Sequence, residues 1–302
     1  MAFRSSVALA AIALSLSAST SAHAYCRTHS GDPGQSTCPP TCANLGNPLS
    51  WHTAELTYGF NARGFPGLTD GQLRSTFVNS FATWQMVTCN RKPIGFKVMA
   101  AEGTTTLEQG PMSDEPHATV ITHYDPAGWA ELGYATRAFA ITAVRFAKSG
   151  QIFGADIGFN GGMDLYGDCA TNQCSSFGLK TDLQNVATHE IGHFLGLSHS
   201  DVAHSTMSCD AQASDTDKRS LEADDIAGIC ASYPPATSFP DDRPHSSRCT
   251  IAPAGTSRTY GDLSVLGLLS GLLCLRRRTR KKSVPGLSSV KERECTLAKK
   301  ML

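Results

Sequence analysis

Apolar residues recur along the chain with two different periods, which predict a mixture of strands and helices. In 51–60 they fall near alternate positions, the spacing of a strand with one buried face. In 73–84 they recur at intervals of three and four, the spacing of a helix with one apolar face. Thr69 and Asp70 precede this helix and are suited to cap its first turn. We therefore expect an amphipathic helix lying on a sheet.

Further strands are expected in the middle of the chain. They are the alternating apolar segment 94–98, the β-branched segment 119–122, and the segments 140–146 and 152–159, which a Lys-Ser-Gly turn separates. Residues 161–178 are rich in turn-forming residues and predict a loop that contains a pair of cysteines.

A second helix is predicted from Thr181 to about Leu195. Thr181 and Gln184 have the spacing of a capping box, in which the Thr hydroxyl accepts from the first main-chain amides and the Gln side chain reaches back. Gly196 follows the helix and suits a left-handed C-terminal cap. A last helix is expected in 220–231, after which the chain becomes rich in Pro and Ser.

The N-terminal end differs from the middle in composition. Residues 1–24 show a basic residue, an apolar run and then small residues, the order of a secretory signal peptide. The run is too short for a membrane helix, which needs about 18 or more apolar residues. Residues 25–48 predict an irregular, disulfide-stapled segment, and 234–262 a linker. We therefore expect one folded domain over 49–233 in a protein that is secreted or resides at the cell surface or in the periplasm.

The C-terminal tail has a pattern of its own. A short apolar segment followed by a basic cluster occupies 263–282, and Cys249 precedes it. This arrangement resembles the MYXO-CTERM type of sorting signal of bacterial surface proteins, which usually stops at the basic cluster, whereas here 283–302 follow. We expect the segment to govern where the protein resides, by membrane attachment; the alternative is an amphiphilic tail of no consequence.

Charge and cysteine content narrow the classes of function. The chain has 26 basic and 26 acidic residues, so it lacks the overall basic field that would draw it to nucleic acid. Eight of the 11 cysteines lie in 25–233, which predicts up to four disulfides in an exported domain. Spacing indicates only one particular pairing, Cys169 with Cys174, which would close a short loop. The alternative, a cysteine zinc cluster, lacks its paired CxxC motifs.

The strongest functional signal is the string HEIGHFLGLSH, which begins at His189. Residues four apart share one face of a helix, so His189 and His193 can bind one metal ion. Gly196 allows a sharp turn that brings His199 back as the third ligand. Three imidazoles leave one position for water, the arrangement of a catalytic zinc ion. Glu190 is then suited to act as general base on a zinc-activated water that attacks a peptide bond.

This motif resembles that of the metzincins and, within them, the matrixins, in which Ser follows the last His as Ser200 does here. The resemblance implies an α/β (α+β) fold with a twisted sheet, an active-site helix, a methionine turn below one catalytic zinc ion, and a C-terminal helix. Met207 stands where the methionine of that turn is expected. Asp224 and Asp225 resemble the acidic pair that supports the turn, with an exposed helix face as the alternative.

The sequence departs from the family pattern at two places. Animal matrixins carry a cysteine switch that blocks the zinc ion, but no such motif is found here, and Cys26 is better explained as a disulfide partner. His123 and Asp125 begin the structural-zinc pattern of those enzymes, yet its later histidines are missing, so no second zinc ion is expected. Calcium is a further candidate, because oxygen ligands gather near one Gly-rich loop; the alternative is ordinary turn residues. The aspartates concerned are Asp156, Asp164 and Asp168.

We therefore predict a monomeric zinc-dependent endopeptidase that hydrolyses proteins or peptides outside the cytoplasm, with 25–240 sufficient for activity. Another metzincin subfamily would perform the same chemistry with a different substrate groove. A surface-binding module with a relic metal site is a rival from another class, but a relic has no reason to retain Glu190. An inert disulfide-rich domain would leave the spacing of the histidines unexplained.

Overall fold

The computed structural model describes eight parts of the chain. They are residues 25–32, 42–108, 119–162, 166–171, 174, 180–212, 214–235 and 295–300. The predicted signal peptide, the apolar tail segment and nearly all of the predicted linker lie outside these residues. None of the helices in the described parts is both long enough and apolar enough to cross a membrane.

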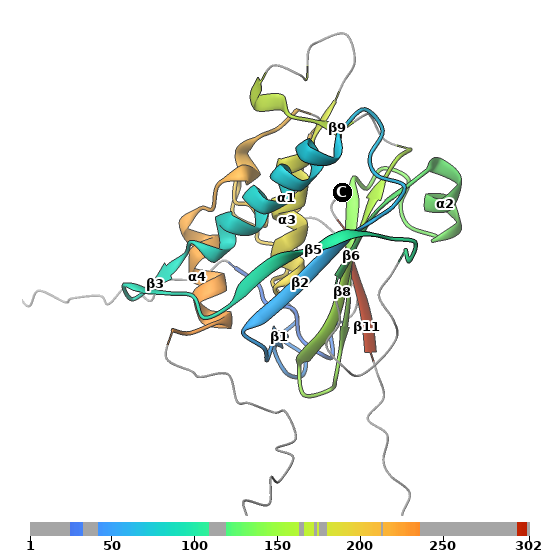
Figure 1. Cartoon of the computed structure of the whole chain (residues 1–302). Helices are drawn as coiled ribbons and strands as arrows, with labels where there is room; N and C mark the ends of the chain where they lie inside the picture. The colour runs from blue at the N-terminus through green and yellow to red at the C-terminus, as the bar shows by residue number, and fades with distance from the viewer. Residues whose placement is uncertain are drawn as a thin grey trace, which may run out of the picture. The chain divides into compact units, whose positions relative to one another are not determined.

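A seven-stranded sheet forms the centre of the domain (Figure 1). Its main path runs in the order β11-β7-β8-β6-β2-β5, and β1 also pairs with β8. The pairs β5–β2, β2–β6, β6–β8 and β1–β8 are parallel, whereas β7 is antiparallel to both β8 and β11. The strands are β1 (Ser50–Trp51), β2 (Glu55–Asn61), β5 (Lys97–Thr105), β6 (Thr119–Tyr124), β7 (Ala140–Phe146), β8 (Gln151–Asn160) and β11 (Cys295–Lys300).

Two helices, α1 (Asp70–Gln85) and α3 (Leu183–Phe194), pack side by side against this sheet (Figure 1). The apolar stripe predicted for 73–84 is confirmed, because its four large side chains are buried in the main core. Thr69 and Gln72 form a complete capping box at the start of α1. The Trp84 indole donates to the Thr188 carbonyl at 2.9 Å, which fixes α1 against the helix that carries the histidine motif.

The second face of the sheet carries a smaller apolar cluster under α2 (Pro126–Glu131). Successive strand residues point to opposite faces. Ala140 of β7 accordingly belongs to the main core, whereas its neighbour Ile141 packs with Trp129 in the smaller cluster. The strand β7 therefore contacts both layers of the domain.

Short elements and disulfides complete the described structure. The elements are β3 (Thr88–Cys89), β4 (Lys92–Pro93), β9 (Tyr166–Gly167), β10 (Thr181–Asp182), the 3-10 turns η1 (Cys169–Thr171) and η2 (Asp217–Arg219), and the helix α4 (Ala223–Ser232). The predicted bridge between Cys169 and Cys174 is confirmed. Two further bridges join residues that spacing could not pair, Cys26–Cys42 and Cys89–Cys230, and Cys209 is disulfide-bonded as well.

The helix caps differ from their predictions. Asp182, not Thr181, caps α3, and its Oδ1 accepts from the Asn185 amide at 2.7 Å. Thr181 and Asp182 both pair with β9 in the extended ladder, so the helix begins only at Leu183 and the residue directly before it, Asp182, is the cap. The last helix begins at Ala223 rather than at 220. Glu222 is its N-cap residue, and the carboxylate of Asp225 in its first turn accepts from the Glu222 amide at 2.9 Å.

Two strands also differ from their predictions. The strand expected at 94–98 begins only at Lys97 and continues to Thr105, since its partner β2 begins opposite Lys97. The tail was not expected to contain a strand, but β11 lies within it. Its partner is the distant strand β7, so nothing local in the tail sequence specifies the pairing.

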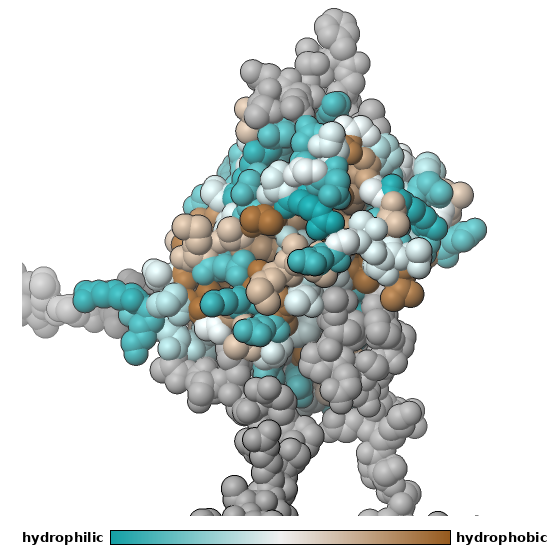
Figure 2. Space-filling model, viewed as in Figure 1, coloured by the Kyte–Doolittle hydropathy of each residue, from teal (hydrophilic) through white to brown (hydrophobic). Residues whose placement is uncertain are grey.

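The surface viewed in Figure 2 mixes polar and apolar side chains over the described residues. Exposed apolar side chains such as Val78, Met86 and Met99 are present. Single exposed apolar residues are normal on folded proteins. These exposed apolar residues therefore do not by themselves indicate a functional site.

Candidate metal centre

Helix α3 and the turn after it bring three histidines together. His189 and His193 lie one turn apart on α3, and both are buried. Gly196 has a φ of +90°, and a side chain there would collide with the Leu49 carbonyl. Only glycine suits this turn, which returns the chain so that His199 faces the helix.

The three side chains converge closely enough to share one ion. Their ring centroids lie 4.8 Å (His189–His193), 5.2 Å (His189–His199) and 4.8 Å (His193–His199) apart. One ligand nitrogen from each lies within 4.8 Å of the others. Within the described ranges, this is the one group of three or more His, Cys, Asp or Glu side chains with such convergence.

Hydrogen bonds to main-chain carbonyls fix two of the imidazole tautomers. His189 Nδ1 donates to the Thr206 carbonyl at 2.7 Å, and His193 Nδ1 donates to the Leu197 carbonyl at 2.9 Å. Because a carbonyl oxygen only accepts, each Nδ1 carries the proton and each Nε2 presents a lone pair. Carbonyl partners of this kind orient histidine ligands in metal sites.

The remaining nitrogens fit a bound cation. His193 Nε2 lies 3.2 Å from His199 Nε2, close to the ~3.3 Å separation of two nitrogens on one tetrahedral zinc ion. Among the described residues, no hydrogen-bond partner accompanies the buried Nε2 of His189. Burial lowers the pKa of His189 well below its ordinary value, and the positive charge of Lys218 adds to this effect. The imidazole is therefore neutral, as a metal ligand must be.

Glu190 lies beside the histidines and is fully buried. Thr142 Oγ donates to its carboxylate Oε2 at 2.6 Å and also contacts its main-chain oxygen at 3.0 Å. The other oxygen, Oε1, has no hydrogen-bond partner among the described residues. Burial raises the pKa of Glu190 to about 8, although the bond from Thr142 and the charge of Lys218 oppose the rise. A carboxylate with one free oxygen can accept a proton and return it.

Met207 packs directly under this helix. It is buried, and its sulfur fills the place where a side chain on Gly192 would lie. Asp225 holds the turn around it, because its carboxylate accepts from the Thr206 amide at 2.8 Å and from the Met207 amide at 3.0 Å. Since the Thr206 carbonyl also accepts from His189, Asp225 is linked to the histidine site through a single residue.

The family comparison agrees with this geometry. A matrixin family model matches residues 50–234. This chain belongs to the matrixin family. Family membership confirms the fold class predicted from the sequence, and matrixins use a catalytic zinc ion, which the three histidines fit.

Two curated relatives match part of this matrixin. It is 46% identical to "Metalloendoproteinase 1-MMP" of Arabidopsis thaliana over 54 residues, which are 18% of this chain and 15% of that protein. It is 52% identical to "Matrilysin" of Rattus norvegicus over 48 residues, which are 16% of this chain and 18% of that protein. The matched regions thus cover less than a fifth of either relative.

The N-terminal segment supports the turn that carries His199. The Thr28 amide donates to the Gly196 carbonyl at 2.9 Å, and the Ser198 amide donates to the Cys26 carbonyl at 2.8 Å. Sequence reasoning described this segment only as irregular and missed its contact with the site. It also missed Thr142, whose one signal is a hydroxyl within an apolar strand. The second predicted aspartate, Asp224, accepts from Ser200 Oγ at 2.6 Å, and the Ser200 amide in turn donates to the Met207 carbonyl at 2.7 Å.

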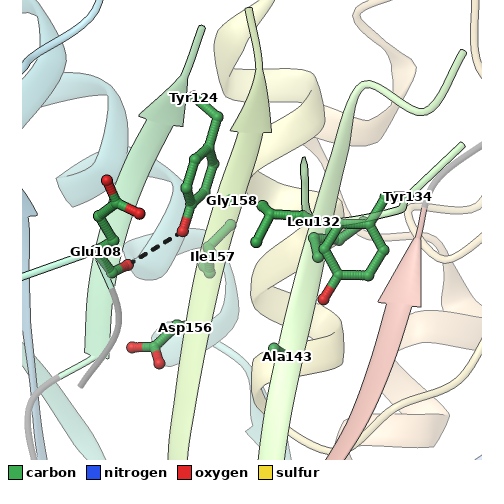
Figure 3. A pocket seen from close by; sticks show the side chains of 9 residues that line it. Glu108, Tyr124, Leu132, Tyr134, Ala143, Asp156, Ile157 and Gly158 are labelled. Carbon is green, nitrogen blue, oxygen red and sulfur yellow. Dashed lines mark hydrogen bonds between the residues drawn. The ribbon is translucent and has the colours of Figure 1, made fainter. Parts of the chain in front are cut away.

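Three of the aspartates near the sites considered for other metals have partners of their own. Asp125 caps α2 by accepting from the Gly128 amide at 2.8 Å. Of the calcium candidates, Asp156 pairs with Arg145 at 2.5 Å and Asp168 pairs with Arg219 at 2.5 Å, whereas Asp164 lies outside the described residues. Asp156 and Tyr134 line a pocket on the second face of the sheet, beside the bond from Tyr124 to the Glu108 carbonyl (Figure 3).

Proposed function

We propose that this matrixin is a zinc-dependent endopeptidase that cleaves proteins or peptides outside the cytoplasm, with Glu190 as its general base. The observation that carries the proposal is the convergence of three buried imidazoles beside a carboxylate with one oxygen free. A buried group of this kind without a metal would leave polar atoms unsatisfied at a cost of several kcal/mol, on the order of 1–3 for each. Catalysis accounts for this arrangement, whereas packing of the core does not.

Each residue of the site has its own role in hydrolysis. When bound, zinc supplies Lewis acidity that acidifies water and stabilises the oxyanion. His189, His193 and His199 would hold the ion through Nε2. Glu190 accepts the proton of the attacking water on Oε1 and then delivers it to the leaving amine. Thr142 keeps the carboxylate oriented by its bond to Oε2.

The test is Glu190→Gln, which keeps the shape of the side chain but removes its basicity. We expect the variant to bind zinc as the parent does and to lose turnover of a casein-type substrate by about 100-fold or more. The matched control is Glu131→Gln, at an exposed position on α2. Near-normal turnover by the Glu190 variant would reject the assigned base, and a parent protein without bound zinc or proteolysis would reject the function.

The location outside the cytoplasm is supported by the sequence pattern of residues 1–24 and by the tail segment 263–282. We propose that the first directs export and the second holds the monomeric enzyme at a membrane face. Expression in an exporting host, followed by fractionation, separates the two roles. Deletion of 1–24 is expected to retain the protein in the cytoplasm, and deletion of 263–282 to release it into the soluble fraction. If a deletion leaves the distribution of the protein between the fractions unchanged, the role proposed for the deleted segment is wrong.

A further inference from the structure

The outer edge of β7 lies next to the catalytic carboxylate. Thr142 in this strand contacts both the side chain and the main chain of Glu190. One side of β7 pairs with β8, so only its other side can receive a further strand. An open strand edge presents a row of main-chain donors and acceptors to any extended segment that approaches it.

In this protein the edge is occupied by a segment of the same chain. β11 pairs antiparallel with β7 from Cys295 opposite Phe146 to Lys300 opposite Ile141, and Lys299 lies opposite Thr142 (Figure 1). Residues 295–300 fall in the same compact unit as the domain. The segment therefore passes directly beside the strand position that contacts Glu190.

A substrate has to use the same region. A protein chain must bring its scissile carbonyl to Glu190 and the three imidazoles, and an extended backbone that does so runs alongside Thr142. Main-chain hydrogen bonds to a sheet edge are a general means of holding such a backbone, because they do not depend on the side chains. One edge has a single row of hydrogen-bonding groups, so β11 and a substrate cannot pair with it together.

We propose that residues 295–300 are an autoinhibitory strand that docks on the β7 edge and must leave before a substrate binds. This inference rests on the proposed function, since inhibition requires an active peptidase. The strand is tethered to the domain, so its effective concentration at the edge is on the order of millimolar, without any need for tight intrinsic binding. Competition of this kind raises KM and leaves kcat unchanged.

The test uses the full-length, zinc-loaded protein with Leu297→Pro and Ala298→Pro together. Proline has no amide proton and disrupts strand pairing, and two consecutive positions remove a ladder donor whichever of them faces β7. The matched control carries Ser289→Pro and Val290→Pro, which precede the strand. With one peptide substrate, we expect KM to fall by about fivefold or more in the strand variant, with kcat unchanged, and the control to match the parent.

A second readout does not depend on activity. Amide hydrogen exchange in Ile141–Arg145 is expected to be faster in the strand variant than in the control, because the edge amides lose their partner. Unchanged exchange would show that the strand does not occupy the edge, and faster exchange with unchanged KM would show that it occupies the edge without inhibiting; either result overturns the proposal. If the exchange changes but every form is inactive, the proposed function has failed and the inhibitory role fails with it.

Discussion

Thr142 Oγ lies 2.6 Å from Glu190 Oε2, and this hydrogen bond joins strand β7 to the helix that carries the histidines. Both residues are fully buried. The bond orients the carboxylate and leaves Oε1 for proton transfer. It also ties the strand that we propose as a docking edge to the proposed general base.

We expect Thr142→Val to lower kcat by about 10–100-fold, because a hydrogen bond to a charged group contributes ~1.5–3 kcal/mol. Zinc content should stay the same, since Thr142 is not a ligand. The control is Thr122→Val, which removes another buried hydroxyl, one that donates to the Glu108 carbonyl at 2.8 Å. Steady-state kinetics and bound zinc are measured together, and equal kcat values for the two variants would exclude the orienting role.

We expect His199→Ala to weaken zinc binding by about 10-fold or more and to abolish hydrolysis, because two imidazoles hold the ion far less tightly than three. The control is His204→Ala. His204 lies close by in the sequence, but 79% of its side chain is exposed and it pairs with Asp217. Competition with a chelator measures the affinity, and an unchanged value for His199→Ala would remove this residue from the site.

We expect Asp225→Asn to lower the free energy of unfolding by ~1–3 kcal/mol, since the new amide group would face a main-chain N–H that now donates to a carboxylate oxygen. The control, Asp224→Asn, should cost less. Asp224 accepts from the Ser200 hydroxyl, which can rotate to donate to an amide oxygen or accept from an amide nitrogen. Urea denaturation gives both values, and equal losses would contradict a specific role of Asp225 in the Met207 turn.

We expect the buried Lys218 to make the free energy of unfolding depend on pH in the alkaline range. Only 4% of its surface is exposed, its ammonium donates to the Ser208 carbonyl, and burial lowers its pKa to about 8 from the ordinary 10.5. Between about pH 8 and 10 the unfolded chain therefore binds a proton that the folded chain lacks, so stability rises with pH. We expect the free energy of unfolding of the metal-free protein to increase by ~2 kcal/mol over this window.

The control for Lys218→Met is the same substitution at another lysine, measured in the same experiment. Lys218→Met should remove the rise, whereas Lys148→Met, in an exposed turn, should retain it. The buried tyrosines, whose pKa values burial raises, act in the opposite sense only from about pH 10 upward and do not affect the window. If the free energy of unfolding still rises with pH in Lys218→Met, another titrating group causes the rise.

The sequence by itself determined the features that depend on local geometry. His189 and His193 share a face because a helix repeats every 3.6 residues, and Gly196 is required by the turn that follows. The apolar stripe of α1 and the bridge Cys169–Cys174 are local in the same sense, since spacing alone brings their members together. These features could be predicted because each needs only a few consecutive residues.

Only the tertiary structure decided the rest. Thr142 and Glu190 are 48 positions apart, and nothing in either segment specifies the other. Thr181 was an equally good cap for α3 by composition, but pairing with β9 keeps both Thr181 and Asp182 extended, so the helix begins at Leu183 and Asp182 caps it. β11 is the clearest case, because a strand edge accepts many sequences through its main chain, so the partner is chosen by which segment the folded domain brings to it.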